Sequence, residues 1–145
     1  MKIGNINIEN PLALGPMAGV TDLPFRLLCK EQGCGILYSE MVSAKAILYN
    51  NKKTKDLLAI DEDEHPVGIQ LFGSDPDIMA EIAGRVSYGA CDFIDVNMGC
   101  PVPKIVNNHE GSYLLTQPKL VEEILTKMVK ESIKPITIKI RKGFK

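Results

Sequence analysis

Short apolar runs alternate with longer amphipathic segments along this chain. The apolar runs predict five strands, at residues 11–14, 36–38, 67–72, 93–97 and 136–140. Several of these runs place apolar residues at consecutive positions, which is typical of parallel strands that are covered on both faces. Strands that alternate with helices in this way predict a parallel sheet whose connections are helical crossovers.

The segments between these strands predict four helices. Their expected beginnings lie near Asp22, Ser43, Asp75 and Thr116. A side chain that can cap the helix, followed closely by proline, marks three of these beginnings. Residues 98–115 predict a long loop, and residues 3–8 predict a small hairpin ahead of the first strand.

Two architectures fit five strands and four helices. One is the N-terminal portion of a TIM (β/α)8 barrel, although a complete barrel usually needs ~250 residues and this chain has 145. The other is a small open α/β domain. The pattern alone slightly favours the open, doubly wound sheet, because that fold needs no further strands.

The composition excludes several classes of protein. The chain is 45% hydrophobic and 24% charged, as in ordinary globular proteins, and no apolar run approaches the ~20 residues that span a bilayer. The N-terminus lacks an apolar signal core, which predicts a cytoplasmic location. A formal net charge of −1 gives this segment no general attraction to nucleic acid.

Four cysteines, Cys29, Cys34, Cys91 and Cys100, have no CxxC spacing among them. That spacing argues against a zinc site, and no other set of side chains predicts a metal. In a reducing compartment the four are expected to be free thiols.

Chemically distinctive residues fall where the predicted strands end. Ligands of parallel α/β folds gather at the carboxyl ends of the strands. The candidate site residues there are Pro16, Met17 and Ala18 after the first strand, Gln70 in the third, Asn97 and Cys100 at the fourth, and Lys139 and Arg141 at the fifth. Their coincidence at one end of the sheet is more informative than any one of them.

Each candidate also has a purely structural explanation. The segment 15–19 could admit a flat ligand, or it could be an ordinary turn. Gln70 could pair with the edge of a heterocycle, or it could hold a neighbouring loop. Lys139 lies between Ile138 and Ile140, so it predicts an anion or polar cavity nearby unless its long stem reaches solvent.

Cys100 follows a glycine and precedes a proline, in a segment beyond a strand. This position predicts an accessible side chain rather than a buried one. An ordinary cysteine thiol is mostly protonated at neutral pH, so Cys100 could act as a proton donor or as a nucleophile.

The sequence motifs at these strand ends resemble those of the tRNA-dihydrouridine synthases, and most closely the bacterial B-type members. The motifs are PLALGPMAGVTDLPF at 11–25, SEMVSA at 39–44, VGIQLFG at 67–73, DVNMGCPVPK at 95–104 and IKIRKG at 138–143. They follow one another in order over essentially the whole chain. The chain departs from the family pattern at Ser112 and Tyr113, where alanines are common.

The resemblance implies that residues 1–145 are the N-terminal part of an FMN-binding (β/α)8 barrel, followed by a helical domain that binds tRNA. It therefore overrides the preference for an open sheet. It implies that Pro16, Met17 and Ala18 line the flavin and that Gln70 and Lys139 contact it. It also implies that Asn97 and Arg141 face the substrate uracil.

The reaction implied by the resemblance has two halves. NADPH first reduces FMN, and reduced FMN then passes a hydride to C6 of a tRNA uridine while Cys100 gives a proton to C5. Hydride addition builds negative charge on the ring, which a thiol near C5 neutralises. The target base must leave its stack to reach such a pocket.

Two alternatives remain beside this interpretation. One is another flavin barrel that acts on free pyrimidines, like the dihydroorotate or dihydropyrimidine dehydrogenases, although Met98-Gly99 before Cys100 and residues 102–104 after it favour the tRNA enzymes. The other is a non-catalytic half-barrel that covers its open edges by pairing with a second copy as a homodimer. We expect the segment alone to bind FMN weakly or not at all and to be inactive.

Overall fold

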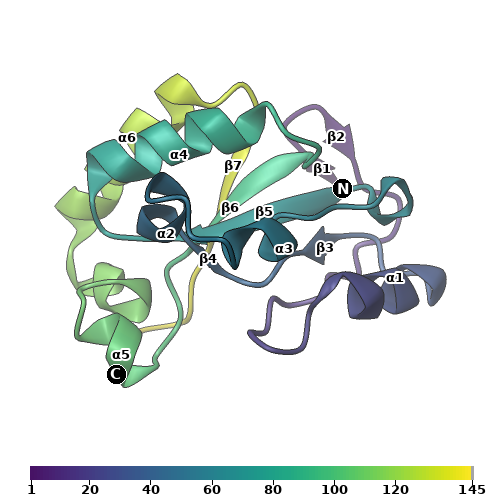
Figure 1. Ribbon diagram of the computed structural model, residues 1–145, viewed down its shortest axis with the longest axis horizontal. Helices are drawn as coiled ribbons and strands as arrows, with labels where there is room; N and C mark the ends of the chain where they lie inside the picture. The colour runs from purple at the N-terminus through teal and green to yellow at the C-terminus, as the bar shows by residue number, and fades with distance from the viewer. Residues whose placement is uncertain (145) are drawn as a thin grey trace.

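A parallel sheet runs through the centre of the computed structural model, which describes residues 1–144 (Figure 1). Its strands are β3 (Leu37–Tyr38), β4 (Val42–Ser43), β5 (Val67–Phe72), β6 (Phe93–Asn97) and β7 (Ile136–Lys139). The order is β3-β5-β6-β7, and β4 also pairs with β5. All of these pairings are parallel, as the alternation of strands and helices predicts.

The strand order distinguishes the two predicted architectures. Each new strand lies beside the preceding one, so order in the sheet follows order in the chain. A doubly wound sheet reverses its direction of growth part-way, whereas a barrel does not. The preference for an open sheet that the hydrophobic pattern alone gave is therefore wrong, and the arrangement is that of a partial barrel.

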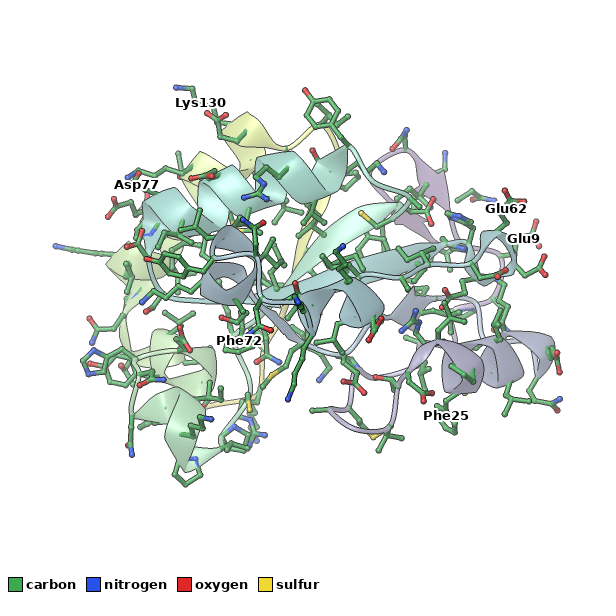
Figure 2. The ribbon with its side chains drawn as sticks, in the orientation of Figure 1. Glu9, Phe25, Glu62, Phe72, Asp77 and Lys130 are labelled. Atoms are coloured by element: carbon green, nitrogen blue, oxygen red, sulfur yellow. The ribbon has the colours of Figure 1, made fainter. Side chains whose placement is uncertain are left out.

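Helices pack on one face of this sheet. Figure 1 shows α4 (Pro76–Ser87) and α6 (Pro118–Glu131) side by side over the strands, with α2 (Ala44–Leu48) next to them. Figure 2 shows Asp77 of α4 and Lys130 of α6 projecting from this layer away from the strands. The helix α1 (Leu23–Glu31) lies apart from them, below the sheet in the same view.

The main hydrophobic core lies between the sheet and these helices. Successive strand residues point to opposite faces, so alternate positions of β5 and β6 enter this core. The core residues include Ile69, Leu71, Ile94 and Val96 from the strands and Met79, Ile82, Ile124 and Met128 from the helices. The intervening strand residues face the other side, where the interior of a barrel lies.

That interior side has an apolar floor, which we define as Ile8, Ile36 and Phe93. The hairpin of β1 (Lys2–Ile3) and β2 (Ile6–Asn7) packs against it at the amino ends of the strands. A β-carbon at Gly68 would lie 2.3 Å from the Phe93 ring, so the ring occupies the space that a side chain would need. The floor therefore fills this side of the sheet at the amino ends of the strands.

One extra residue interrupts the pairing of β3 and β4 with β5. Tyr38 pairs with Gly68, and Val42 pairs with Leu71, so four steps on one side match three on the other. An unpaired residue of this kind bends a strand and redirects the side chains that follow. Here it puts Val42 into the core behind the sheet, while Met41 lines the cavity described below.

Most predicted elements are confirmed. The strands at 67–72 and 93–97 and the hairpin have the expected positions, and Asp22 and Asp75 cap α1 and α4 through their side chains. The pattern did not predict the short α3 (Thr54–Leu57) or the 3-10 helix η1 (Glu62–Glu64).

Two predictions need correction. The expected first strand at 11–14 makes only a single parallel bridge, between Ala13 and Ile36. The expected loop at 98–115 contains α5 (Pro103–Val106) and most of the 3-10 helix η2 (Gly111–Thr116). Both helices are short, so neither has enough turns to produce a periodic pattern. Among residues 1–144, no helix is long and apolar enough to cross a membrane.

Candidate cofactor and substrate site

A cavity of about 280 Å³ opens at the carboxyl ends of the strands. It brings together all of the predicted site residues except Met17: Pro16, Ala18, Gln70, Asn97, Cys100, Lys139 and Arg141. Sequence reasoning missed four further lining residues, Met41, Gly99, Pro101 and Val102. Met17 lies outside the lining, and its side chain is 47% exposed.

Hydrogen bonds join two lining amides, Gln70 and Asn97, to Asp95, Thr137 and the Cys100 backbone in one chain, which we call the amide relay. Thr137 Oγ1 donates to Asp95 Oδ1 at 2.7 Å, and Gln70 Nε2 donates to Asp95 Oδ2 at 2.6 Å. Asn97 Nδ2 donates to Gln70 Oε1 at 2.9 Å. The backbone nitrogen of Cys100 then donates to Asn97 Oδ1 at 2.9 Å. The relay therefore connects β7 to the segment that bears the thiol.

The Cys100 segment is also held from behind. The backbone nitrogen of Ser112 donates to the Cys100 oxygen at 2.9 Å. Gly111 begins η2 with a φ of +60°, and a β-carbon there would lie 2.7 Å from the same oxygen. Only glycine combines that backbone conformation with so close a contact. The turn at Gly111 thus lets η2 support Cys100 directly.

Asp95 is a charged residue that sequence reasoning passed over as part of a strand. Its side chain is almost completely buried. Burial raises the pKa of the Asp95 carboxyl, while the hydrogen bonds from Gln70 and Thr137 and the charge of Lys139 lower it by less. The available signal was an acidic residue within an otherwise apolar run, since such a residue is rarely buried without partners.

The segment that bears Pro16 and Ala18 is fixed by a side chain farther along. Thr21 Oγ1 accepts from the backbone nitrogen of Met17 at 3.0 Å and donates to the Met17 oxygen at 3.2 Å. These two bonds close the turn around Ala18. Gly19, inside the turn, donates its backbone N–H to Glu40 Oε1 at 2.9 Å.

A buried ion pair secures the far end of this turn. Arg26 of α1 lies 2.5 Å from Glu64 of η1, and both side chains are almost fully buried. Arg26 also donates to the backbone oxygens of Thr21, at 3.0 Å, and Ala59, at 2.8 Å. The guanidinium thereby joins the turn at 16–21 to the segment before β5.

Two cations contribute to the rim of the cavity. Lys139 ends β7, and Arg141 follows it. Both side chains are exposed in the structure, so Lys139 takes the solvent-reaching position that was the alternative to burial. It nevertheless lines the cavity, where it places a positive charge beside neutral amides.

A cavity behind the sheet has a different lining. A space of similar volume behind the sheet is lined mainly by apolar residues of α2, α4 and β5, together with Arg85 and Cys91. Burial raises the pKa of the Cys91 thiol, which keeps it protonated and unreactive. Within residues 1–144, no group of three or more His, Cys, Asp or Glu side chains could hold a metal ion.

Comparison with known proteins gives the family. Residues 12–145 match the family described as dihydrouridine synthase (Dus). This chain belongs to the dihydrouridine synthase family. The family fold is a TIM barrel, so the chain-ordered sheet of this Dus chain is part of such a barrel.

Curated relatives of this Dus chain are named tRNA-dihydrouridine synthase B. The protein of Pasteurella multocida is 43% identical over 145 residues, and that of Pseudomonas aeruginosa is 45% identical over 145 residues. A third, from Vibrio parahaemolyticus, is 42% identical over 144 residues. Each alignment covers 99% of the Dus chain but only 43–45% of the relative, so the chain spans less than half of their length.

Proposed function

We propose that this chain is the N-terminal part of the barrel of a flavin-dependent tRNA-dihydrouridine synthase, which reduces the C5–C6 bond of uridine in tRNA. The observation that carries the proposal is the convergence of the Cys100 segment, two buried amides and two cations on one cavity at the carboxyl ends of the strands. The names of the relatives support the same substrate.

The residues around the cavity fit FMN as the cofactor. Pro16 and Ala18 would present a small apolar surface to a flat ring, and Gln70 would offer an amide to a heterocycle edge. Lys139 supplies a positive charge beside this surface. When bound, FMN supplies the hydride for the reduction, and NADPH is the proposed external reductant.

Cys100 is the proposed proton donor. Its thiol would give a proton to C5 of the uracil while C6 receives the hydride, so that no charge is left on the ring. Asn97 and Arg141 are the proposed contacts to the uracil, because both line the same cavity as Cys100. The hydrogen bond from the Cys100 backbone nitrogen to Asn97 would keep the thiol, the proposed proton donor, in place relative to the bound base.

The tRNA is the proposed partner, with its target base turned out of the stack into this cavity. The described residues carry no strong excess of positive charge, so we assign most tRNA affinity to a helical domain outside this chain. A cytoplasmic location follows from a tRNA substrate and forms part of the proposal.

A direct assay tests the proposal. The full-length protein is incubated with FMN, NADPH and unmodified tRNA, and dihydrouridine is counted by mass spectrometry of the digested tRNA. We expect dihydrouridine at specific positions and no reduction of free dihydropyrimidine precursors. The reverse result, with free pyrimidines as substrates and tRNA untouched, would move the protein to the class of free-pyrimidine dehydrogenases.

The isolated 145-residue chain provides a second test, because the proposal leaves the barrel incomplete. Its exposed apolar residues include Leu12 next to the Ala13 bridge, Leu28 of α1, Ile138 of β7 and Ile140 just after β7. We expect weak or no FMN binding by this piece. A yellow monomer, or a stable homodimer without flavin, would instead favour an independent half-barrel.

A further inference from the structure

We propose that Asp95 is a positioning residue. It sets the orientation of the Gln70 and Asn97 side-chain amides, that is, which partner meets the oxygen and which meets the nitrogen, and thereby the position of Cys100. The inference rests on the proposed function for its importance to the reaction, but its structural content stands on the amide relay alone. Asp95 does not line the cavity, so it acts only through other residues.

The first step of the argument concerns the carboxylate end of the relay. Asp95 Oδ2 acts as an acceptor in the relay, so Gln70 presents its NH2 group to Asp95. The 2.6 Å bond from Gln70 Nε2 to Asp95 Oδ2 has this polarity. With its nitrogen committed to Asp95, Gln70 must point its oxygen toward Asn97, which donates to it at 2.9 Å.

The second step concerns the other end of the relay. The backbone nitrogens of Gly99 and Cys100 can only donate, so Asn97 must present its oxygen to them. The distances are 3.2 Å from Gly99 and 2.9 Å from Cys100. Asn97 therefore points its NH2 group back toward Gln70. The carboxylate and the backbone thus impose the same orientation on both amides.

The third step concerns the burial of the relay. Gln70 is 0% exposed, Asp95 1% and Asn97 9%, so water does not compete freely for these bonds. An amide whose partner is removed in such a place leaves a polar group without compensation, and it can turn over to find another. Loss of the Asp95 acceptor would free Gln70 to flip, and a flipped Gln70 would set its NH2 group against that of Asn97.

The matched variants are Asp95→Leu and Asp95→Asn. Leucine is similar in size and accepts no hydrogen bond, so it removes the fixed end of the relay. Asparagine retains one oxygen for Gln70 and can turn its nitrogen to Thr137, whose hydroxyl accepts as well as donates. Positioning by an acceptor therefore predicts that Asp95→Asn keeps the function that Asp95→Leu loses.

The readout is the rate at which iodoacetamide alkylates Cys100 in the full-length protein without tRNA, followed by mass spectrometry of the Cys100 peptide. We expect Asp95→Leu to change this rate about fivefold, which corresponds to roughly 1 kcal/mol, the net worth of one hydrogen bond. Asp95→Asn should stay close to the unmodified protein, and so should alkylation of the distant Cys34 in both variants.

Thermal unfolding separates positioning from general stability. Asp95→Leu leaves the buried Gln70 amide without its acceptor, so its unfolding midpoint should fall, and alkylation is compared at a temperature at which every variant is folded. Unchanged Cys100 alkylation in Asp95→Leu would overturn the proposal. Equal effects of Asp95→Leu and Asp95→Asn would also overturn it, because the charge rather than the acceptor would then be responsible.

A measurement on the unmodified protein covers the case in which Asp95→Leu does not fold. In nuclear magnetic resonance spectra, the side-chain amides of Gln70 and Asn97 should each show a proton that exchanges slowly with solvent. Rapid exchange of both amides would overturn the proposal. These experiments use no tRNA, so failure of dihydrouridine formation would reject the proposed function and leave the relay standing.

Discussion

The backbone nitrogen of Cys100 donates a hydrogen bond of 2.9 Å to the side-chain oxygen of Asn97, three residues before it. The same oxygen accepts from Gly99 at 3.2 Å. One side chain at the end of β6 therefore terminates the strand and shapes the segment that follows. The thiol of the proposed mechanism is therefore on a segment held by Asn97, which lines the same cavity.

Asn97→Ala should lower the stability of the protein and loosen the Cys100 segment. The substitution removes the acceptor of two backbone donors, and a buried donor without a partner costs about 1–3 kcal/mol. Denaturant unfolding of the full-length protein measures this loss. Asn108→Ala, at an exposed position, is the control and should leave the unfolding midpoint unchanged. Equal midpoints for the two variants would show that the Asn97 bonds contribute little.

Cys100→Ala should retain FMN and lose the reduction of tRNA. The thiol is the proposed proton donor, and loss of such a group commonly slows a reaction by about 10²–10⁴-fold. Flavin absorbance and dihydrouridine content are measured on the same preparation. Cys34→Ala serves as the control, since Cys34 does not line the cavity. Normal dihydrouridine formation by Cys100→Ala would remove Cys100 from the mechanism.

Lys139→Ala should weaken FMN binding by roughly 10- to 100-fold, the usual effect of losing a hydrogen bond to a charged group. Lys139 is the cavity cation at the end of β7, whereas the exposed Lys142 is not among the lining residues. Titration of the flavin-free protein with FMN compares Lys139→Ala with the control Lys142→Ala. An affinity unchanged in Lys139→Ala would show that this lysine does not hold the cofactor.

Arg26→Met should destabilise the protein by about 3–5 kcal/mol, because it leaves the buried Glu64 carboxylate without its partner. It should also disturb the turn at 16–21, whose Thr21 oxygen Arg26 holds. The matched control is Lys127→Met, which breaks a surface pair with Asp77 and should barely move the unfolding midpoint. Equal midpoints for the two variants would argue against a structural role for the buried pair.

Glu110→Gln should flatten the dependence of stability on pH. Burial raises the pKa of the Glu110 carboxyl above its ordinary value of 4.5, while the charge of Lys45 lowers it by less. The folded protein then binds the Glu110 proton more tightly than the unfolded chain does. The stabilisation this provides is complete below the ordinary value and is lost as pH rises through the raised pKa.

Urea unfolding across this pH range measures the effect. Lys45→Met is the counterpart variant, since removal of the lysine charge should raise the pKa of Glu110 further and move the loss of stability to higher pH. A pH profile that is the same in Glu110→Gln and the unmodified protein would show that Glu110 titrates alike in both states.

The long regular elements could be predicted from the sequence because they leave periodic patterns. The strand at 67–72 has apolar residues at most positions, and Asp75-Pro76 marks the beginning of α4. The short η1 and α5 have no such pattern, since three or four residues do not complete enough turns to repeat. The bridge at Ala13 could not be separated from a full strand for the same reason.

Sequence reasoning named most of the residues that line this cavity because strand ends can be located along the chain. It missed Met41, since the extra residue before Val42 redirects the chain only when β5 lies beside it. It missed the role of Asp95, because partners such as Gln70 and Thr137 are distant in sequence. It included Met17 because the segment around it is suitable, yet Met17 is half exposed and is not among the lining residues.

The apolar floor has a practical consequence for anyone who wishes to alter this protein. Phe93 belongs to the floor, while Asp95 and Asn97, two and four positions later on the same strand, belong to the relay. Work aimed at heat resistance can therefore concentrate on Ile8, Ile36 and their neighbours without disturbing reactivity. Attempts to change the chemistry can begin at the carboxyl end of β6, with the apolar floor left unchanged.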